Sequence, residues 1–487
     1  MATDARRPPA LFDPTSFQAF RFTARELDAS GRATLRYALD EEVEFVEELQ
    51  LPIGAPIGPA PARLSEAELA RVDGLLALLH WVAGVSYFKT ALPAHVSCET
   101  GAPPPAAAAL LDALYSEGLG ELAYVNGLPA LPRPRFGAGP AEVGTAHGEP
   151  AGAPRPRFDA RAAEPEDRWP GERQPRRVLV PVGGGKDSVV ALEIVRRSGL
   201  ELSLFSLGDA APIARTVAVA GLPRLLARRR LDPRLRECNA AGAINGHVPI
   251  TAIVSCVALL TAALNGFDAV AMANERSASA GNVVWDGVEV NHQFSKGLRA
   301  ERLLRAAAAE AASDAPALFS VLRPASELAI ARAFARLERY HGAFTSCNAI
   351  FRSDPALRAS SWCCECPKCR FVFLALAPFS EPARLREVFG RDLLAEEEQF
   401  AGFALLAAAG GHKPFECVGE EQETLAAMRL LAADPRWRSH GVVRRLAAEV
   451  LSRRPPSAGD PAAALALGED HDVPPALLAS VRALLGA

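Results

Sequence analysis

The spacing of apolar and polar residues changes character along the chain. Over residues 33–39 they alternate, after a turn-forming run at 28–31, which is typical of strands joined by a tight turn. Residues 65–68 (Ser-Glu-Ala-Glu) match a capping box, and apolar residues follow at helical spacing. The first part, residues 1–128, is therefore predicted to be a small α+β domain in which an antiparallel meander packs against a helix.

Residues 129–175 show neither the alternation of a strand nor the apolar spacing of a helix. They are rich in Pro, Gly, Ala and Arg and contain two Pro-Arg-Pro-Arg runs. Such runs could bind an acidic partner, but the composition favours a solvated spacer. We predict a linker.

From residue 176 short apolar runs alternate with helical segments. The predicted strands span residues 178–182, 202–207, 269–273, 317–321 and 343–346. Predicted helices at 189–197 and 248–264 lie between them, and strand–helix–strand repeats indicate a parallel sheet. Residues 176–380 are thus predicted to form a doubly wound α/β domain. Residues 381–487 are predicted to be mostly helical, with no assigned chemistry.

Composition narrows the function classes. The chain has 487 residues, 49% apolar and 23% charged, as in folded globular proteins. Its 53 basic and 57 acidic side chains give a net charge of -4, which provides no general field for a nucleic acid. The first residues lack the apolar core of a secretory signal, and the uncharged run at 248–264 is shorter than the ~20 residues of a membrane span. We therefore expect a cytoplasmic protein without membrane insertion or a nucleic-acid partner.

A glycine cluster separates the first strand of this α/β part from its first helix. It comprises Gly183, Gly184, Gly185, Lys186, Asp187 and Ser188. Glycines let backbone N–H groups converge on an anion, the helix dipole adds positive potential, and Ser188 is expected to cap the helix. The order of residues is not that of a Walker loop. Asp187 would repel phosphate unless a cation lay between them, so the cluster predicts a phosphate site that uses Mg²⁺.

The Gly-Gly-Gly-Lys-Asp-Ser run resembles the PP-loop of the ATP pyrophosphatases, which has a Ser/Gly-Gly-Gly-x-Asp-Ser signature after the first strand of a parallel sheet. This resemblance implies that ATP is the cofactor and is cleaved between its α and β phosphates. An oxygen nucleophile of the substrate would attack the α-phosphorus, and the loop and Mg²⁺ would hold the departing pyrophosphate. A carboxylate, an amide or a base carbonyl could each be that nucleophile.

Four cysteines have the spacing of a metal site. Cys363, Cys366 and Cys369 form C-x-x-C-x-x-C, and Cys347, predicted at the end of a strand, can supply a fourth thiolate. Cys364 does not fit the C-x-x-C-x-x-C spacing, so its side chain is expected to point away from the other cysteines. Zinc and an iron–sulfur cluster both fit such ligands. Zinc is favoured because the arrangement is similar to the structural four-cysteine site of 7-cyano-7-deazaguanine synthases.

Polar segments surround the predicted strands and the buried helix. They lie at residues 245–249, 274–279, 291–297 and 412–420. Together with the glycine loop, the cysteines and the N-terminal residues 84–89, they resemble the family of UDP-N-acetyl-alpha-muramoyl-L-alanyl-L-glutamate epimerases. The resemblance extends through residue 420 and omits the linker and the last ~65 residues.

This family resemblance implies an ATP- and Mg²⁺-dependent isomerase that inverts the terminal L-Glu of a UDP-muramoyl dipeptide for peptidoglycan synthesis. Adenylating the carboxylate would make its Cα proton removable, and a base would then take it. His247 and His292 are the first candidates for this base, followed by Glu275 and Lys296.

Further residues are expected to bind ligand. Asn274 and Arg276, after the predicted strand at 269–273, join the glycine loop as candidate nucleotide-binding residues. Lys296 and Arg276 could also hold the substrate's carboxylate or diphosphate.

Two alternatives stay open at this point. One is a PP-loop enzyme that modifies tRNA or a deazapurine. The acidic N-terminal strands and the negative net charge disfavour a tRNA substrate. The other is a nucleotide sensor without catalysis. The sequence does not identify a protein partner, and it does not show whether one catalytic base or two transfer the Cα proton.

Overall fold

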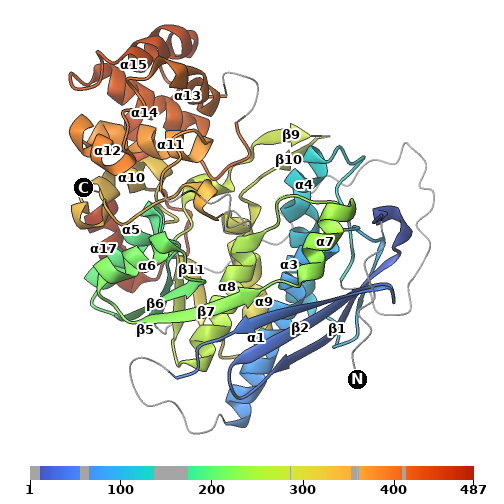
Figure 1. Ribbon diagram of the computed structural model, residues 1–487. Helices are drawn as coiled ribbons and strands as arrows, with labels where there is room; N and C mark the ends of the chain where they lie inside the picture. Colours follow the sequence, from blue (N-terminus) through green and yellow to red (C-terminus); the bar gives the residue numbers. More distant parts are fainter. Residues whose placement is uncertain are drawn as a thin grey trace.

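The computed structural model of the 487-residue chain describes residues 11–54, 65–136, 174–285, 287–351, 359, 361–408 and 413–486 (Figure 1). Most of the predicted linker, at 137–173, lies outside the described residues. Its first part, residues 129–136, lies within them, and the ring of Phe136 packs 4.8 Å from that of Tyr115 in the N-terminal core.

One nine-stranded sheet runs through the molecule. In spatial order its strands are β11 (Ala317–Ser320), β8 (Ala269–Met272), β5 (Arg177–Pro181), β6 (Glu201–Leu207), β7 (Arg224–Arg230), β3 (Val43–Gln50), β2 (Arg32–Leu39), β1 (Ala19–Leu27) and β4 (His95–Cys98). The first five are mutually parallel, β7, β3, β2 and β1 pair antiparallel, and β4 is parallel to β1. A separate hairpin pairs β9 (Val283–Trp285) with β10 (Val288–Val290).

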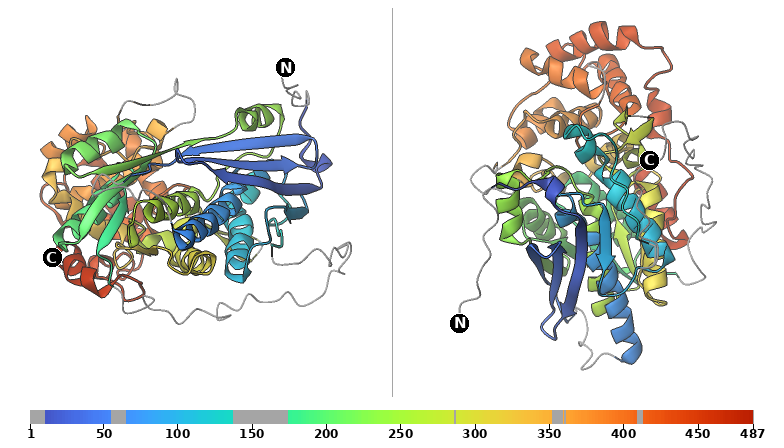
Figure 2. Two further views of the ribbon diagram at one scale, coloured as in Figure 1. Left: turned by 90° about the horizontal axis from the view of Figure 1, so that it is seen from below. Right: turned by 90° about the vertical axis from the view of Figure 1, so that its right-hand side faces the viewer.

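Helices cover both faces of the parallel strands. On one face lie α5 (Lys186–Arg197), α10 (Glu327–Ala335) and α17 (Pro475–Leu485), and on the other α1 (Glu66–Ala83), α8 (Ile250–Leu264) and α9 (Leu298–Ala311). Successive β5 side chains alternate between the two cores: Val178 and Val180 enter the first, and Leu179 enters the second. Figure 2 shows the layers edge on. The predicted α/β class with a parallel sheet is confirmed.

The N-terminal meander also forms as predicted. Alternate residues of β2 are buried, the turn uses Gly31 with φ +83°, and Ser65 and Glu68 make the capping box of α1. The meander does not stand apart, however, because β3 pairs with β7 and extends the parallel sheet. A bidentate ion pair reinforces this joint: Arg229 Nε and Nη2 donate to the two carboxylate oxygens of buried Glu47 at 2.7 and 2.9 Å.

The parallel part of the sheet differs from the prediction at two strands. Residues 343–346 were expected to form a strand, but they complete a turn and continue without regular secondary structure, and Thr345 N donates to Gly184 O in the glycine loop at 2.9 Å. That prediction, and the placement of Cys347 at a strand end, are wrong. Conversely, β7 was missed because its sequence, Arg-Leu-Leu-Ala-Arg-Arg-Arg, looks too charged for an inner strand.

The long apolar helices are core elements. The stretch Glu66–Phe88, which includes α1 and α2 (Val85–Phe88), is the only one among the described residues long and apolar enough for a membrane span. Its apolar window is 72% buried inside the fold, as expected of a helix that covers a sheet. The uncharged segment at 248–264 supplies α8, which is buried against α1 and β8.

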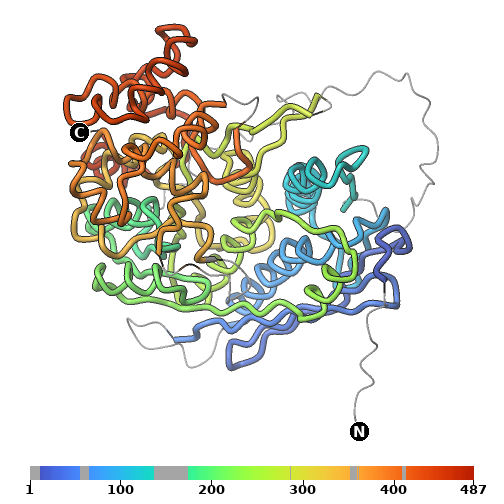
Figure 3. Tube along the Cα trace, turned by 45° about the horizontal axis from the view of Figure 1, so that its top comes forward, coloured from blue at the N-terminus to red at the C-terminus, as the bar shows by residue number. Residues whose placement is uncertain are grey.

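The remaining helices complete the two ends of the molecule. Near the meander lie α3 (Pro105–Ser116), α4 (Gly120–Val125) and α7 (Pro233–Ala241). Helix α6 (Ala211–Ala220) connects β6 to β7 and lies on the α5 side of the parallel strands, where Ile213 and Ala220 join the first core. The C-terminal part contains α11 (Pro367–Leu376), α12 (Pro382–Phe389), α13 (Phe400–Leu406), α14 (Glu421–Ala433), α15 (Gly441–Arg445) and α16 (Pro461–Leu465). Figure 3 shows these orange and red helices gathered at one end, away from the blue meander. The predicted helical character after residue 381 is confirmed.

Candidate functional site

The glycine loop lies where the strand order of the parallel sheet reverses. From β5 the chain proceeds outward to β6 and β7, then returns through α8 to β8 on the other side of β5. Such a reversal opens a crevice at the carboxyl ends of the two central strands, and ligands of open α/β sheets bind there. The loop 183–185 follows β5, and Asn274 and Glu275 follow β8, so the topology brings both predicted segments to this crevice.

The three glycines are required for different reasons. Gly184 has φ +80°, and a Cβ there would lie 2.7 Å from the backbone of Pro212. A Cβ on Gly185 would meet only the side chain of Ser346, at 2.7 Å from Oγ. No described atom lies within 4 Å of a Cβ on Gly183, although a phosphate approaching the loop would need that space.

Helix α5 begins directly after the loop. Gly185 is its N-cap, and among the described residues no side chain caps it. The hydroxyl of Ser188 instead donates to Gly185 O at 2.9 Å, so the prediction that Ser188 caps the helix is wrong. The N–H groups of the first turn have no partners within the helix, and they remain available to an anion.

Buried charges lie behind the loop. The ammonium of Lys186 is fully buried and pairs with the carboxylates of Asp187 and Glu327. Burial alone would lower the pKa of Lys186, but these two carboxylates raise it above its ordinary value. The Nζ of Lys368 lies 3.5 Å from the other oxygen of Glu327, on the first turn of α10.

Glu275 brings an incompletely paired carboxyl group to the same place. It is 2% exposed, and its Oε1 has no hydrogen-bond partner among the described residues. Burial and the neighbouring Glu327 raise the pKa of Glu275. A buried carboxyl group with a free oxygen can accept a hydrogen bond from a ligand or take up a proton.

The other predicted residues after β8 have different surroundings. Asn274 is buried next to Glu275. The guanidinium of Arg276, by contrast, donates to Ala466 O of the C-terminal part at 3.2 Å. The structure therefore does not bring Arg276 into the cluster of buried charges, and we assign it no ligand role.

Lys296 connects the loop to a second polar cluster. Its Nζ is 3.4 Å from Gln293 Oε1, and the negative charges that act on it include Cys417, Glu275 and Asp187. Burial would lower the pKa of Lys296, but these groups raise it, so the side chain is a cation. A buried cation of this kind can stabilise an oxyanion.

The two predicted histidines lie together but differ in charge. Their ring centroids are 4.2 Å apart, and Nδ1 of His292 pairs with the carboxylate of Glu121 on α4. Burial, with His292 and Lys296 nearby, lowers the pKa of His247 to about 3. Burial would do the same to His292, but hydrogen bonds to Cys417 and Glu121 raise its pKa to about 9. At neutral pH His247 is thus neutral and His292 is charged.

Segment 413–420 closes over this second cluster. Asn282 Nδ2 donates to Pro414 O at 2.8 Å, the ammonium of Lys368 donates to Cys417 O, and the ring of Phe415 lies 5.4 Å from that of Tyr124. The Cys417 side chain is hydrogen-bonded to His292. Of the polar segment predicted at 412–420, residue 412 itself lies outside the described residues.

The predicted cysteine ligands converge. The sulfur atoms of Cys347, Cys363, Cys366 and Cys369 all lie within 4.8 Å of one another, with Cys363 Sγ 3.7 Å from Cys369 Sγ. Four thiolates around zinc at about 2.3 Å stand about 3.8 Å apart, so the set fits one tetrahedral ion. The side chain of Cys364 points elsewhere, with Sγ 3.4 Å from Phe389 O, as its register predicted.

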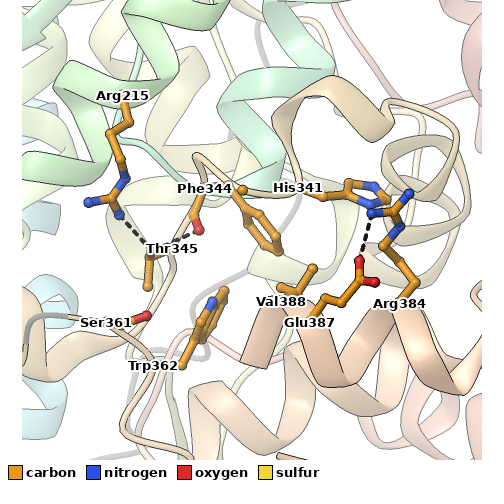
Figure 4. A pocket seen from close by; sticks show the side chains of 10 residues that line it. Arg215, His341, Phe344, Thr345, Ser361, Trp362, Arg384, Glu387 and Val388 are labelled. Carbon is orange, nitrogen blue, oxygen red and sulfur yellow. Dashed lines mark hydrogen bonds and ion pairs between the residues drawn. The ribbon is translucent and has the colours of Figure 1, made fainter. Parts of the chain in front are cut away.

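A pocket of about 380 Å³ adjoins the glycine loop (Figure 4). The aromatic rings of Phe344 and Trp362 are 5.2 Å apart in its wall, and Arg215 Nη2 donates to Thr345 Oγ1 at 3.2 Å. Thr345 in turn contacts Gly184 through its backbone. The pocket thus combines flat apolar surfaces with a cation beside the phosphate loop.

Sequence reasoning missed several members of the site. They are Glu121, Glu327, Lys368 and Cys417. Two of them had a visible signal: Lys368 lies within the cysteine motif, and Cys417 lies in a polar segment already singled out. Glu121 and Glu327 sit in ordinary helical sequence and gave none.

The architecture defines an α/β protein with a glycine loop at the reversal point of its sheet and a cluster of four cysteines that could hold a metal ion. Two family models match the chain, the MurL N-terminal domain over residues 11–321 and the MurL C-terminal domain over residues 343–460. The chain belongs to the MurL family, whose named members are epimerases and hence isomerases. These models meet between residues 321 and 343, whereas the predicted domains meet at the linker.

Curated relatives cover nearly the whole chain. Proteins of Micromonospora sp. and Salinispora tropica are 45% and 46% identical to it over 94% and 88% of its length, covering 96% and 88% of their own. A protein of Xanthomonas oryzae pv. oryzae is 39% identical over 97% of this chain and 99% of its own. All three are named UDP-N-acetyl-alpha-D-muramoyl-L-alanyl-L-glutamate epimerase.

Proposed function

We propose that this protein inverts the terminal L-Glu of UDP-N-acetylmuramoyl-L-Ala-L-Glu to D-Glu, using ATP to adenylate the glutamate carboxylate next to Cα. The observation that carries the proposal is the position of Lys296, which interacts with Asp187 of the glycine loop and with the cluster that contains Cys417. An activating site and a proton-transfer site are thus neighbours. The substrate in this proposal is the one that the names of the relatives give.

The chemistry explains why both sites are needed. A Cα proton beside a carboxylate is hard to remove because the product would be a dianion. Adenylation removes the carboxylate charge, so loss of the proton leaves a single enolate charge next to a cation. Reprotonation on the opposite face inverts the centre, and water then releases AMP.

The nucleotide is proposed to bind with its phosphates on the loop. The N–H groups of Gly184, Gly185 and the first turn of α5 would face the pyrophosphate, and Asp187 would hold Mg²⁺. The pocket walled by Phe344 and Trp362 suits the adenine, because bases stack on aromatic side chains. We also propose one structural zinc at the four cysteines, because a site with four protein ligands has no open position for a substrate. We also propose that the enzyme works in the cytoplasm, because its proposed cosubstrate is ATP.

Product analysis tests the proposal. Purified protein is incubated with ATP, Mg²⁺ and UDP-N-acetylmuramoyl-L-Ala-L-Glu, and D-Glu is measured after acid hydrolysis by chiral chromatography. AMP and pyrophosphate should form only with the dipeptide substrate present. Formation of D-Glu without ATP, or with ADP and orthophosphate as products, would contradict adenylation. Turnover of ATP with a deazapurine or tRNA, without D-Glu formation, would instead favour the alternative class of PP-loop enzyme.

A further inference from the structure

The second polar cluster contains a thiol that the predicted histidine chemistry does not use. Glu121, His292 and Cys417 form a chain in which the carboxylate holds Nδ1 of the imidazole. The same imidazole is hydrogen-bonded to the side chain of Cys417. A carboxylate, an imidazole and a thiol in this order are an arrangement that activates sulfur.

The surroundings of the thiol favour its anion. Burial would raise the pKa of Cys417, but Lys296, His292 and Lys368 together lower it to about 6. The imidazole beside it is charged, because its own pKa lies near 9. A charged imidazole cannot accept a proton, so the free base of this pair is the sulfur.

The position of Cys417 also suits contact with substrate. The side chain is only partly buried, and the backbone carbonyl of Cys417 is fixed by Lys368, which also reaches Glu327 behind the glycine loop. Lys296 lies within electrostatic reach of both Cys417 and Asp187. A carboxylate activated near Asp187 would thus lie within electrostatic reach of Lys296, which also acts on the sulfur of Cys417.

From this geometry we infer that Cys417 is a catalytic residue that transfers the Cα proton on one face of the glutamate, with His292 and Glu121 as positioning residues. The inference rests on the proposed function for its substrate. The Cα–H bond breaks as an S–H bond forms, and the electron pair passes to the oxygen of the adenylated carboxyl group. A proton from solvent is then delivered to Cα from the opposite face, and the thiol returns to solvent the proton that it took.

Alkylation tests the thiol independently of turnover. The full-length protein with its metal bound is treated with iodoacetamide at pH 7, and modified peptides are quantified by mass spectrometry. Cys417 should react at least tenfold faster than Cys98, a partly buried thiol whose pKa burial raises to about 12. His292→Gln should lower the Cys417 rate towards that of Cys98. Equal rates at both cysteines in the unaltered protein would overturn the inference.

Isotope exchange tests the catalytic role. Cys417→Ser should still release AMP and pyrophosphate but lose epimerisation by ~10²–10⁴-fold, as for other acid–base residues. In D₂O the unaltered enzyme should place deuterium at Cα of both epimers, whereas Cys417→Ser should label one epimer or neither. Cys98→Ser is the matched control and should behave like the unaltered enzyme.

The outcomes separate two kinds of failure. Epimerisation by Cys417→Ser within threefold of the unaltered enzyme, or labelling of both epimers, would refute the role of Cys417. A substrate adduct on Cys417 in the intact mass would make it a nucleophile instead, and would refute proton transfer. If the unaltered enzyme formed no AMP, the adenylation proposal would fail, while alkylation would still report on the thiol.

Discussion

The three glycines of the loop face different surroundings, so substituting each in turn can separate an effect on ligand binding from an effect on folding stability. The perturbation is one methyl group, added by Gly183→Ala, Gly184→Ala or Gly185→Ala. At Gly184 the methyl would meet fixed backbone at 2.7 Å and would hold a side chain at φ +80°. At Gly183 it would meet no described atom within 4 Å.

The magnitudes follow from these contacts. A left-handed backbone costs an ordinary residue roughly 1–2 kcal/mol, and crowding in a packed region costs about 1–3 kcal/mol. Gly184→Ala should therefore lose about 2–5 kcal/mol of unfolding free energy. At about 2.1 cal/mol/K per residue, 487 residues unfold with roughly 1 kcal/mol/K, so Tm should fall by about 2–5 °C. Gly183→Ala should leave Tm within about 1 °C.

Activity should follow a different order from stability. If phosphate occupies the open side of Gly183, its methyl blocks the ligand, and pyrophosphate release should fall ~100-fold despite an unchanged Tm. Gly185→Ala meets only the Ser346 hydroxyl, so combining it with Ser346→Ala should restore its Tm. Tm is measured by circular dichroism, and pyrophosphate release by a coupled assay. Full activity of Gly183→Ala, or an unchanged Tm for Gly184→Ala, would refute the reasoning.

Three further predictions test other parts of the structure. Elemental analysis should find one zinc per chain, lost in Cys366→Ala and Cys369→Ala together with soluble protein, while Cys364→Ser keeps the metal; iron in place of zinc would contradict this. Arg229→Met leaves Glu47 buried and unpaired, so this variant should lose about 3–5 kcal/mol of unfolding free energy, or about 3–5 °C in Tm. The double variant with Glu47→Met should recover most of that loss, and a double variant no more stable than the single one would rule out the pairing. Glu423 on α14 is buried, and this burial raises the pKa of Glu423 to about 8. Its contribution to stability is therefore complete below about pH 4.5 and is lost as the pH rises through 8, so Glu423→Gln should flatten the fall in Tm between pH 5 and 8, and an unchanged profile would count against a buried neutral carboxyl.

The elements that the sequence predicted are those with local signals. Alternation identified β2, the capping box identified the start of α1, and cysteine spacing identified ligands that do meet. The glycine loop was also placed correctly, since its strand and helix are contiguous with it.

What was missed depends on partners far along the chain. The charges of β7 are tolerated because Arg229 finds Glu47 about 180 residues away, a pairing with no local signature. Glu327 becomes a site residue only because α10 brings it to Lys186, and residues 343–346 leave the sheet because Thr345 bonds to the glycine loop. The charges of the histidines likewise depend on Glu121 and Cys417, which only the folded structure brings to them.

The joint between β3 and β7 has a consequence for recombining members of this family. The register pairs Glu48 with Arg230 and Gln50 with Arg228, and Glu47 reaches Arg229 across the same two strands. A chimaera that took residues 1–136 from one relative and the rest from another would cut no strand, yet it would replace one side of this seam. We expect such hybrids to fold only when both parents carry matching charges at these positions. Grafting the N-terminal part between species therefore means exchanging β7 along with it.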